Sequence, residues 1–133
     1  GHIQEVILQP YSPGSQESLA RLGFEITKLP QVIKLARQIL PADITIQIPP
    51  NLIPNPELLL ACLTAGARDL GGIVPKDEVN PDYHHLQLAE LSVLLASNGW
   101  NLQPRLPVYR DREHYLSDRL QAKILDRRQL MLE

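Results

Sequence analysis

Three short hydrophobic runs have the length and periodicity of β-strands: Ile3–Leu8, Asp43–Pro49 and Asp69–Val74. In the second run, isoleucines alternate with Thr45 and Gln47, so one face of the strand is apolar and the other is polar. A fourth run, Trp100–Leu106, contains a proline, which places it at a sheet edge or in a turn.

Between these runs, hydrophobic residues recur at the spacing of three and four that is typical of amphipathic helices. The first such segment begins at Pro30 and stops before Pro41, because proline fits the first turn of a helix but cannot continue one. The second begins with an N-cap asparagine, a first-turn proline and an acidic residue. We expect helices over Pro30–Leu40, Asn55–Gly66, Leu86–Ser97 and Glu113–Leu132, and residues 19–24 are ambiguous.

This alternation of strands and helices predicts an α/β fold built from successive parallel βα units. In such folds, ligands bind at the loops that follow the carboxyl ends of the strands. Here those loops are Gln9–Ser18, Pro49–Pro54 and Pro75–His85, and most of the twelve prolines fall in or beside them. Because proline stiffens a loop, these segments are suited to hold side chains in fixed positions.

The composition and net charge argue against several classes of protein. The 133 residues carry a formal net charge of -2, which argues against a nucleic-acid or membrane-surface protein. No apolar run reaches the roughly 18 residues that span a bilayer, and the first residues do not resemble a signal peptide. The single cysteine, Cys62, excludes an internal disulfide framework or a thiolate-held iron-sulfur cluster within this chain. We therefore expect a reducing, cytoplasmic setting.

Several conspicuous residues have an ordinary structural explanation. The turn Ser12–Ser15 offers backbone N–H groups to a phosphate but lacks the glycine-lysine spacing of a nucleotide-binding loop. The neighbouring His84 and His85 do not have the three- or four-residue spacing of a metal-binding pair on a helix. Cys62 lies in an apolar helix and is interpreted as a core residue, and Arg127–Arg128 as helix surface.

Polar and glycine residues near the strand ends are better candidates for ligand contacts. Gln47 alternates away from the isoleucines, and Asn51 follows two prolines in the next loop. These side chains either contact a ligand or satisfy one another by hydrogen bonds inside a barrel. Gly71–Gly72 permits either a ligand or a packed helix to approach the backbone closely.

Five stretches of the chain occur in the order, and at the approximate spacing, of one enzyme family: His2–Gln9, Ile46–Leu52, Asp69–Ile73, Val79–Pro81 and Arg105–Tyr109. Over these stretches the chain resembles the carboxyl-terminal half of 7,8-didemethyl-8-hydroxy-5-deazariboflavin synthase (FO synthase) in its first-subunit form. That family belongs to the radical S-adenosylmethionine enzymes and acts in deazaflavin cofactor biosynthesis.

The resemblance implies a TIM-type (β/α) barrel, of which residues 1–133 form a single partial segment containing the last βα units. On this resemblance, the amino-terminal, cluster-binding half is expected to be absent. The resemblance further implies that the complete enzyme, a lyase, cleaves S-adenosylmethionine reductively at a [4Fe-4S] cluster. The resulting radical closes the ring of an adduct of tyrosine and 5-amino-6-ribitylaminouracil, with loss of ammonia. A second subunit makes this small-molecule adduct.

The family's Cys-x-x-x-Cys-x-x-Cys loop has no counterpart here, so the fragment alone is expected to be inactive, with neither catalytic residues nor metal ligands of its own. The candidate contacts to S-adenosylmethionine or substrate are Gln9, Gln47, Asn51, Gly71 and Gly72. Two alternatives remain open. One is a non-catalytic binding or scaffold module that has lost the cluster domain, and the other is a half-barrel of another metal- or phosphate-dependent enzyme.

Overall fold

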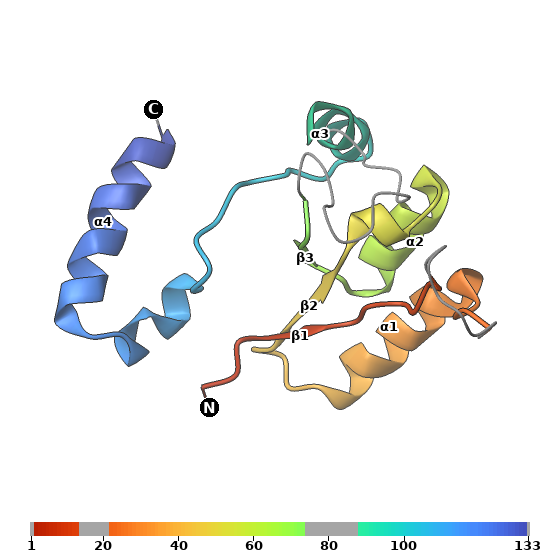
Figure 1. The fold of residues 1–133 in the computed structure, drawn as a ribbon, viewed down its shortest axis with the longest axis horizontal. Helices are drawn as coiled ribbons and strands as arrows, with labels where there is room; N and C mark the ends of the chain where they lie inside the picture. The colour runs from red at the N-terminus through yellow and green to blue at the C-terminus, as the bar shows by residue number, and fades with distance from the viewer. Residues whose placement is uncertain (1, 14–21, 74–87, 133) are drawn as a thin grey trace. The chain divides into compact units, whose positions relative to one another are not determined.

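The computed structural model describes residues 2–13, 22–73 and 88–132 (Figure 1). Within it, residues 5–101 form one unit, and residues 1–4 with 102–133 form another. Several sequence predictions lie outside the described residues: Val74, the second half of the turn Ser12–Ser15, the loop Pro75–His85 with its two histidines, the stretch Val79–Pro81 and the start of the helix expected from Leu86.

A three-stranded parallel sheet organises the larger unit (Figure 1). The strands β1 (Glu5–Ile7), β2 (Thr45–Ile48) and β3 (Asp69–Leu70) lie side by side in sequence order. The helix α1 (Leu29–Ile39) connects the first pair of strands, and α2 (Pro56–Ala65) connects the second. The predicted α/β class and parallel βα units are therefore confirmed, although each strand is shorter than expected.

One face of the sheet is closed by packing against helices. Ile46 and Ile48 of β2 have no exposed surface, and neither has Ile33 of α1. The remaining buried apolar residues come mainly from the two connecting helices and their flanking loops: Leu29, Ile44, Ile53, Leu59, Cys62, Leu63, Ala67, Leu91 and Leu95. Full burial of one such large side chain stabilises the folded state by about 1.5–3 kcal/mol. The isoleucine alternation in β2 thus faces the helices, as predicted.

The loop between α1 and β2 is held by one side chain. The guanidinium of Arg37 donates to the carbonyl oxygens of Ile44 at 2.6 Å and Leu40 at 3.1 Å, and also to that of Pro41. The stem of Arg37 packs on Gly66, where an added Cβ would lie 3.1 Å from the arginine Cγ. Arg37 therefore ties the end of α1 and the start of β2 to the end of α2.

The predicted ends of α2 are confirmed in detail. The side chain of Asn55 accepts a hydrogen bond from the backbone N–H of Leu58 at 2.8 Å. At the other end, Gly66 has a φ of 131°, a conformation that residues with a side chain rarely adopt. The chain then turns so that the N–H of Arg68 donates to the carbonyl of Ile46 at 3.0 Å, which aligns β3 beside β2.

The helix α3 (Leu88–Ser97) follows the predicted pattern and ends at the predicted Asn98–Gly99, where Gly99 has a φ of 78°. The N–H of Trp100 donates to the carbonyl of Leu95, and the guanidinium of Arg68 lies 4.9 Å from the centre of the Trp100 ring. Trp100 is therefore a packing residue, as expected. Short 3₁₀ segments, η1 (Ile26–Lys28) and η2 (Pro50–Leu52), were not predicted.

Of the two possibilities for Trp100–Leu106, an edge strand and a turn, the edge strand is not formed. These residues have no regular structure, because Pro104 has no N–H to give to a sheet and Trp100 still completes the end of α3. The expected helix over Glu113–Leu132 is divided into η3 (Arg110–Tyr115) and α4 (Asp118–Leu132). Ser117 separates them, and its carbonyl accepts the N–H groups of Leu120 and Gln121.

Among the residues that the structure describes, no helix is both long enough and apolar enough to cross a membrane.

We expect the isolated 133-residue chain to self-associate. Ile7 on the face of the sheet away from the helices is 53% exposed, and Ile39 of α1 is 72% exposed. The sheet also has β1 and β3 at its edges, where unpaired strands favour association. Size-exclusion chromatography with light scattering measures the mass, and Ile39→Lys should shift the distribution toward the monomer. A chain that elutes as a stable monomer at all accessible concentrations would contradict this expectation.

Candidate functional site

The carboxyl ends of the three parallel strands lie at one edge of the sheet, and the sequence candidates follow them. Gln9 lies two residues beyond β1, Asn51 lies three beyond β2, and Gly71–Gly72 follow β3 directly. Gln47 is the third residue of β2, opposite Ile7 of β1 and Asp69 of β3 in the strand register.

A row of polar side chains crosses the face of the sheet that lies opposite the buried isoleucines. The amide nitrogen of Gln47 donates to the Glu5 carboxylate at 3.2 Å and to the Asp69 carboxylate at 3.4 Å. One side chain in the middle strand therefore joins both neighbouring strands through charge-assisted hydrogen bonds. The two acids were not among the sequence candidates. The available signal was the position of each acid within the first or third hydrophobic run. That position shows which acids lie beside Gln47 only once the strand register is known.

Gly71 is required by the position of Gln47. A Cβ at Gly71 would collide with the amide end of Gln47, whereas the N–H of Gly71 bonds to the carbonyl of Ile48 at 3.1 Å. The missing side chain thus leaves the room that the Gln47 amide occupies. The group closest to Gly71 is thus a side chain of the neighbouring strand and not a packed helix, and contact between this glycine and a ligand stays a prediction.

Asn51 lies in η2, and its side-chain oxygen is buried. This Oδ1 atom accepts no hydrogen bond from any residue that the structure describes. Nearby Gly72 has a φ of 69°, and a Cβ there would lie 3.8 Å from the same oxygen. Leaving a buried acceptor unpaired costs about 1–3 kcal/mol, so a ligand N–H that reached this atom would recover that free energy.

The structure thus brings four of the five sequence candidates together in two adjacent pairs, Gln47 with Gly71 and Asn51 with Gly72. Gln9 is exposed, and no hydrogen bond among the described residues joins it to the other four. These contacts form a polar corner at the carboxyl edge of β2 and β3.

Cys62 is a core residue, as expected. It has no exposed surface in α2, and burial raises the pKa of its thiol from 9.0 to about 11. A thiol with this pKa is protonated at neutral pH and is a poor metal ligand and nucleophile. The part of the chain that the structure describes contains no group of three or more His, Cys, Asp or Glu side chains arranged for a metal ion.

The interpretation of Arg127–Arg128 as plain helix surface needs correction. Arg128 is partly buried and forms an ion pair with Glu113, whose Oε2 lies 3.3 Å from the arginine Nη1. The contact joins η3 to α4, which no local pattern in the sequence indicates. His114 is exposed, as expected, with its ring centre 4.2 Å from that of Tyr115.

Curated proteins with closely similar sequences share one name. Over 131 residues, the chain is 60% identical to the 7,8-didemethyl-8-hydroxy-5-deazariboflavin synthase of Trichormus variabilis. The aligned region covers 98% of this chain and 38% of the relative. The synthase of Synechocystis is 60% identical over 124 residues (93% of this chain, 40% of the relative). That of Gloeobacter violaceus is 61% identical over 109 residues (82% and 33%).

The resemblance that the five stretches indicated is therefore confirmed. The chain spans about two fifths of the length of the curated relatives that it matches, which is consistent with a carboxyl-terminal segment. No family model and no solved structure matches it.

Gly71→Ala should displace the Gln47 side chain and break its hydrogen bonds to Glu5 and Asp69. We expect a loss of about 1 kcal/mol in the free energy of unfolding, because flexible atoms move rather than the backbone. Urea unfolding measures this loss. In a Gln47→Ala background, Gly71→Ala should lower the free energy of unfolding much less, since the obstructing amide is gone. Equal costs in both backgrounds would show that Gly71 does not act through Gln47.

Cys62 should resist alkylation until the chain unfolds. A pKa of about 11 in place of 9.0 lowers the thiolate fraction at pH 8 about a hundredfold, in addition to the protection by burial. The raised pKa also implies that Cys62 does not change the free energy of unfolding below pH 9. Above pH 9 the unfolded chain ionises first, so this free energy falls as the pH rises from 9 toward 11. Mass spectrometry after iodoacetamide treatment, with and without urea, gives the rates of Cys62 alkylation in the unfolded and the folded chain. Similar rates in both conditions would contradict a buried thiol.

Proposed function

We propose that this chain is the carboxyl-terminal part of a radical S-adenosylmethionine enzyme that makes the 5-deazaflavin chromophore. The observation that carries the proposal is the 60% identity over 131 residues to an FO synthase. In the complete protein, the reaction is the ring closure of the adduct derived from tyrosine and 5-amino-6-ribitylaminouracil, with loss of ammonia. A second subunit supplies this adduct.

The arrangement of the larger unit supports a place in a TIM-type barrel. Its three strands are parallel and lie in sequence order, as neighbouring βα units of such a barrel do. The helix-covered face of β2 is apolar, and the opposite face carries the hydrogen-bonded row of Glu5, Gln47 and Asp69. In a closed barrel, this polar row faces the interior. We propose that the preceding strands and helices come from the amino-terminal half of the enzyme.

The residues of this chain do not fit the [4Fe-4S] cluster. Its only cysteine is buried in α2 with a pKa of about 11, and three thiolates are needed. The cluster ligands are therefore assigned to the amino-terminal half, and this chain alone is expected to be inactive. No step of the reaction is assigned to a cysteine here.

The polar corner at the carboxyl edge does fit a ligand that carries N–H groups. Both S-adenosylmethionine and the diaminouracil portion of the substrate present such donors. The unpaired Oδ1 of Asn51 would accept one of them, and the open side of Gly72 would let the ligand approach. S-adenosylmethionine supplies the radical chemistry when bound. In this proposal, Asn51 and Gly72 contact the ligand, Gln47 and Gly71 hold the polar row beside it in place, and Gln9 borders the same edge.

The test is made in the full-length enzyme with its second subunit. Asn51→Ala removes the acceptor and should weaken binding of S-adenosylmethionine or substrate about tenfold, the usual value of one good hydrogen bond to a ligand. Gln47→Ala should have a similar effect, because its amide fixes the polar row. Calorimetry gives the affinity for S-adenosylmethionine, and the fluorescence of the deazaflavin product gives turnover and the KM for substrate.

Two exposed residues of the same types serve as matched controls: Gln38→Ala on α1 and Asn101→Ala after α3. Both should leave binding and turnover unchanged. If Gln47→Ala and Asn51→Ala also leave every parameter unchanged, the assignment of the polar corner is wrong. If the wild-type enzyme forms no deazaflavin with its second subunit, the proposed activity is wrong.

A further inference from the structure

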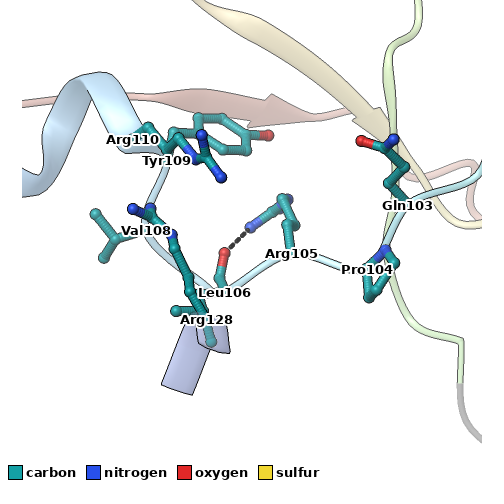
Figure 2. Close-up of a pocket in the computed structure, with 8 residues that line it drawn as sticks. All are labelled: Gln103, Pro104, Arg105, Leu106, Val108, Tyr109, Arg110 and Arg128. Atoms are coloured by element: carbon teal, nitrogen blue, oxygen red, sulfur yellow. Dashed lines mark hydrogen bonds between the residues drawn. The ribbon is translucent and has the colours of Figure 1, made fainter. Parts of the chain in front are cut away.

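The smaller unit contains a cavity of about 640 Å³ that no sequence candidate touches. Three arginines, Arg105, Arg110 and Arg128, lie around it, and Figure 2 shows that they come from the loop before η3, from η3 itself and from α4. The other lining residues are Gln103, Pro104, Leu106, Val108 and Tyr109. The volume is within the range of small-molecule pockets, roughly 300–1,000 Å³.

The charge of this lining differs from that of the rest of the protein. The whole chain has a formal net charge of -2, yet the residues that line the cavity include three arginines and no aspartate or glutamate. Glu113 pairs with Arg128 from outside the lining and compensates one of the three positive charges. Arg110 has no ion-pair partner among the described residues, so the cavity keeps an uncompensated positive charge there, which attracts anions.

The loop that bears Arg105 is held in place by hydrogen bonds. Arg105 Nη1 donates to the carbonyls of Leu106 at 2.9 Å and Pro107 at 3.2 Å, as Figure 2 shows for the first of these. Its guanidinium also lies 4.4 Å from the centre of the Tyr109 ring. These contacts fix the plane of the guanidinium before any ligand arrives, which lowers the entropic cost of binding.

A residue from the start of the chain fixes the other side of the same loop. The amide nitrogen of Gln4 donates to the carbonyl of Pro107 at 2.7 Å, and its oxygen accepts the N–H of Tyr109 at 3.0 Å. Tyr109 is thereby held between Gln4 and Arg105. Arg110 follows directly, and its exposed side chain makes no hydrogen bond or ion pair with another residue that the structure describes.

We propose that this cavity binds the oxyanion group of a small molecule, a carboxylate or a phosphate. A guanidinium recognises either group through two parallel N–H···O bonds, and Arg110 is available to form them. Arg105 supplies a second, pre-oriented guanidinium, and Arg128 is anchored by its ion pair. Its lining residues are different from those of the polar corner, and the proposal does not depend on the proposed synthase activity.

Titration of the full-length protein with sodium phosphate and with sodium acetate, at constant ionic strength, tests the proposal. Chemical-shift changes in the backbone amides of Gln103, Val108 and Tyr109 should saturate with at least one of the two anions. Tighter binding of phosphate identifies a phosphate site, and tighter binding of acetate identifies a carboxylate site. The absence of saturation with both anions would overturn the proposal.

Three variants separate a specific site from general attraction by charge. Arg110→Gln should weaken binding about tenfold, because one charge-assisted pair is lost. Arg105→Lys keeps the charge but loses the planar fork, and should weaken binding severalfold while circular dichroism stays unchanged. Arg119→Gln removes an exposed arginine of α4 outside the cavity and should have no effect. If Arg119→Gln weakens binding as much as Arg110→Gln does, the cavity is not the site.

Discussion

The structure of the larger unit depends on the burial of one face of β2. Ile46 and Ile48 have no exposed surface, and they belong to the same core as the buried residues of α1 and α2. Because side chains alternate along a strand, this burial forces Thr45 and Gln47 onto the opposite face. A shift of the strand register by one residue would bury Gln47 and expose the isoleucines, at a cost of several kcal/mol. The polar row of the candidate site is thus a direct consequence of hydrophobic packing on the other side.

The parts of the fold that were predictable are those determined by neighbouring residues. The caps of α2 depend on Asn55 and Gly66 alone, and the isoleucine alternation of β2 is visible over seven residues. The sequence could not decide between an edge strand and a turn near Trp100, because pairing with a sheet is not a local property. The ion pair of Glu113 with Arg128, fifteen residues apart, escaped prediction for the same reason.

The candidate site was predictable in position but not in its chemistry. Strand-end position alone singled out Gln47, Asn51 and the two glycines. The sequence does not reveal that Gln47 is already engaged with two carboxylates, whereas the Oδ1 of Asn51 is buried with no donor among the described residues. That distinction decides which residue has bonding capacity left for a ligand. The difference arises from the burial of the Asn51 Oδ1 atom, and this burial depends on side chains from the whole larger unit.

The two consecutive residues Gln4 and Glu5 serve different parts of the chain. Glu5 accepts a hydrogen bond from Gln47 in the sheet, whereas Gln4 binds the backbone at Pro107 and Tyr109, more than a hundred residues further on. A short deletion at the amino terminus, which leaves every strand and helix intact, would therefore release the loop that carries Arg105. A tag or cleavage site that displaced Gln4 would remove two hydrogen bonds from the loop that lines the arginine cavity, although it is remote from that loop in sequence.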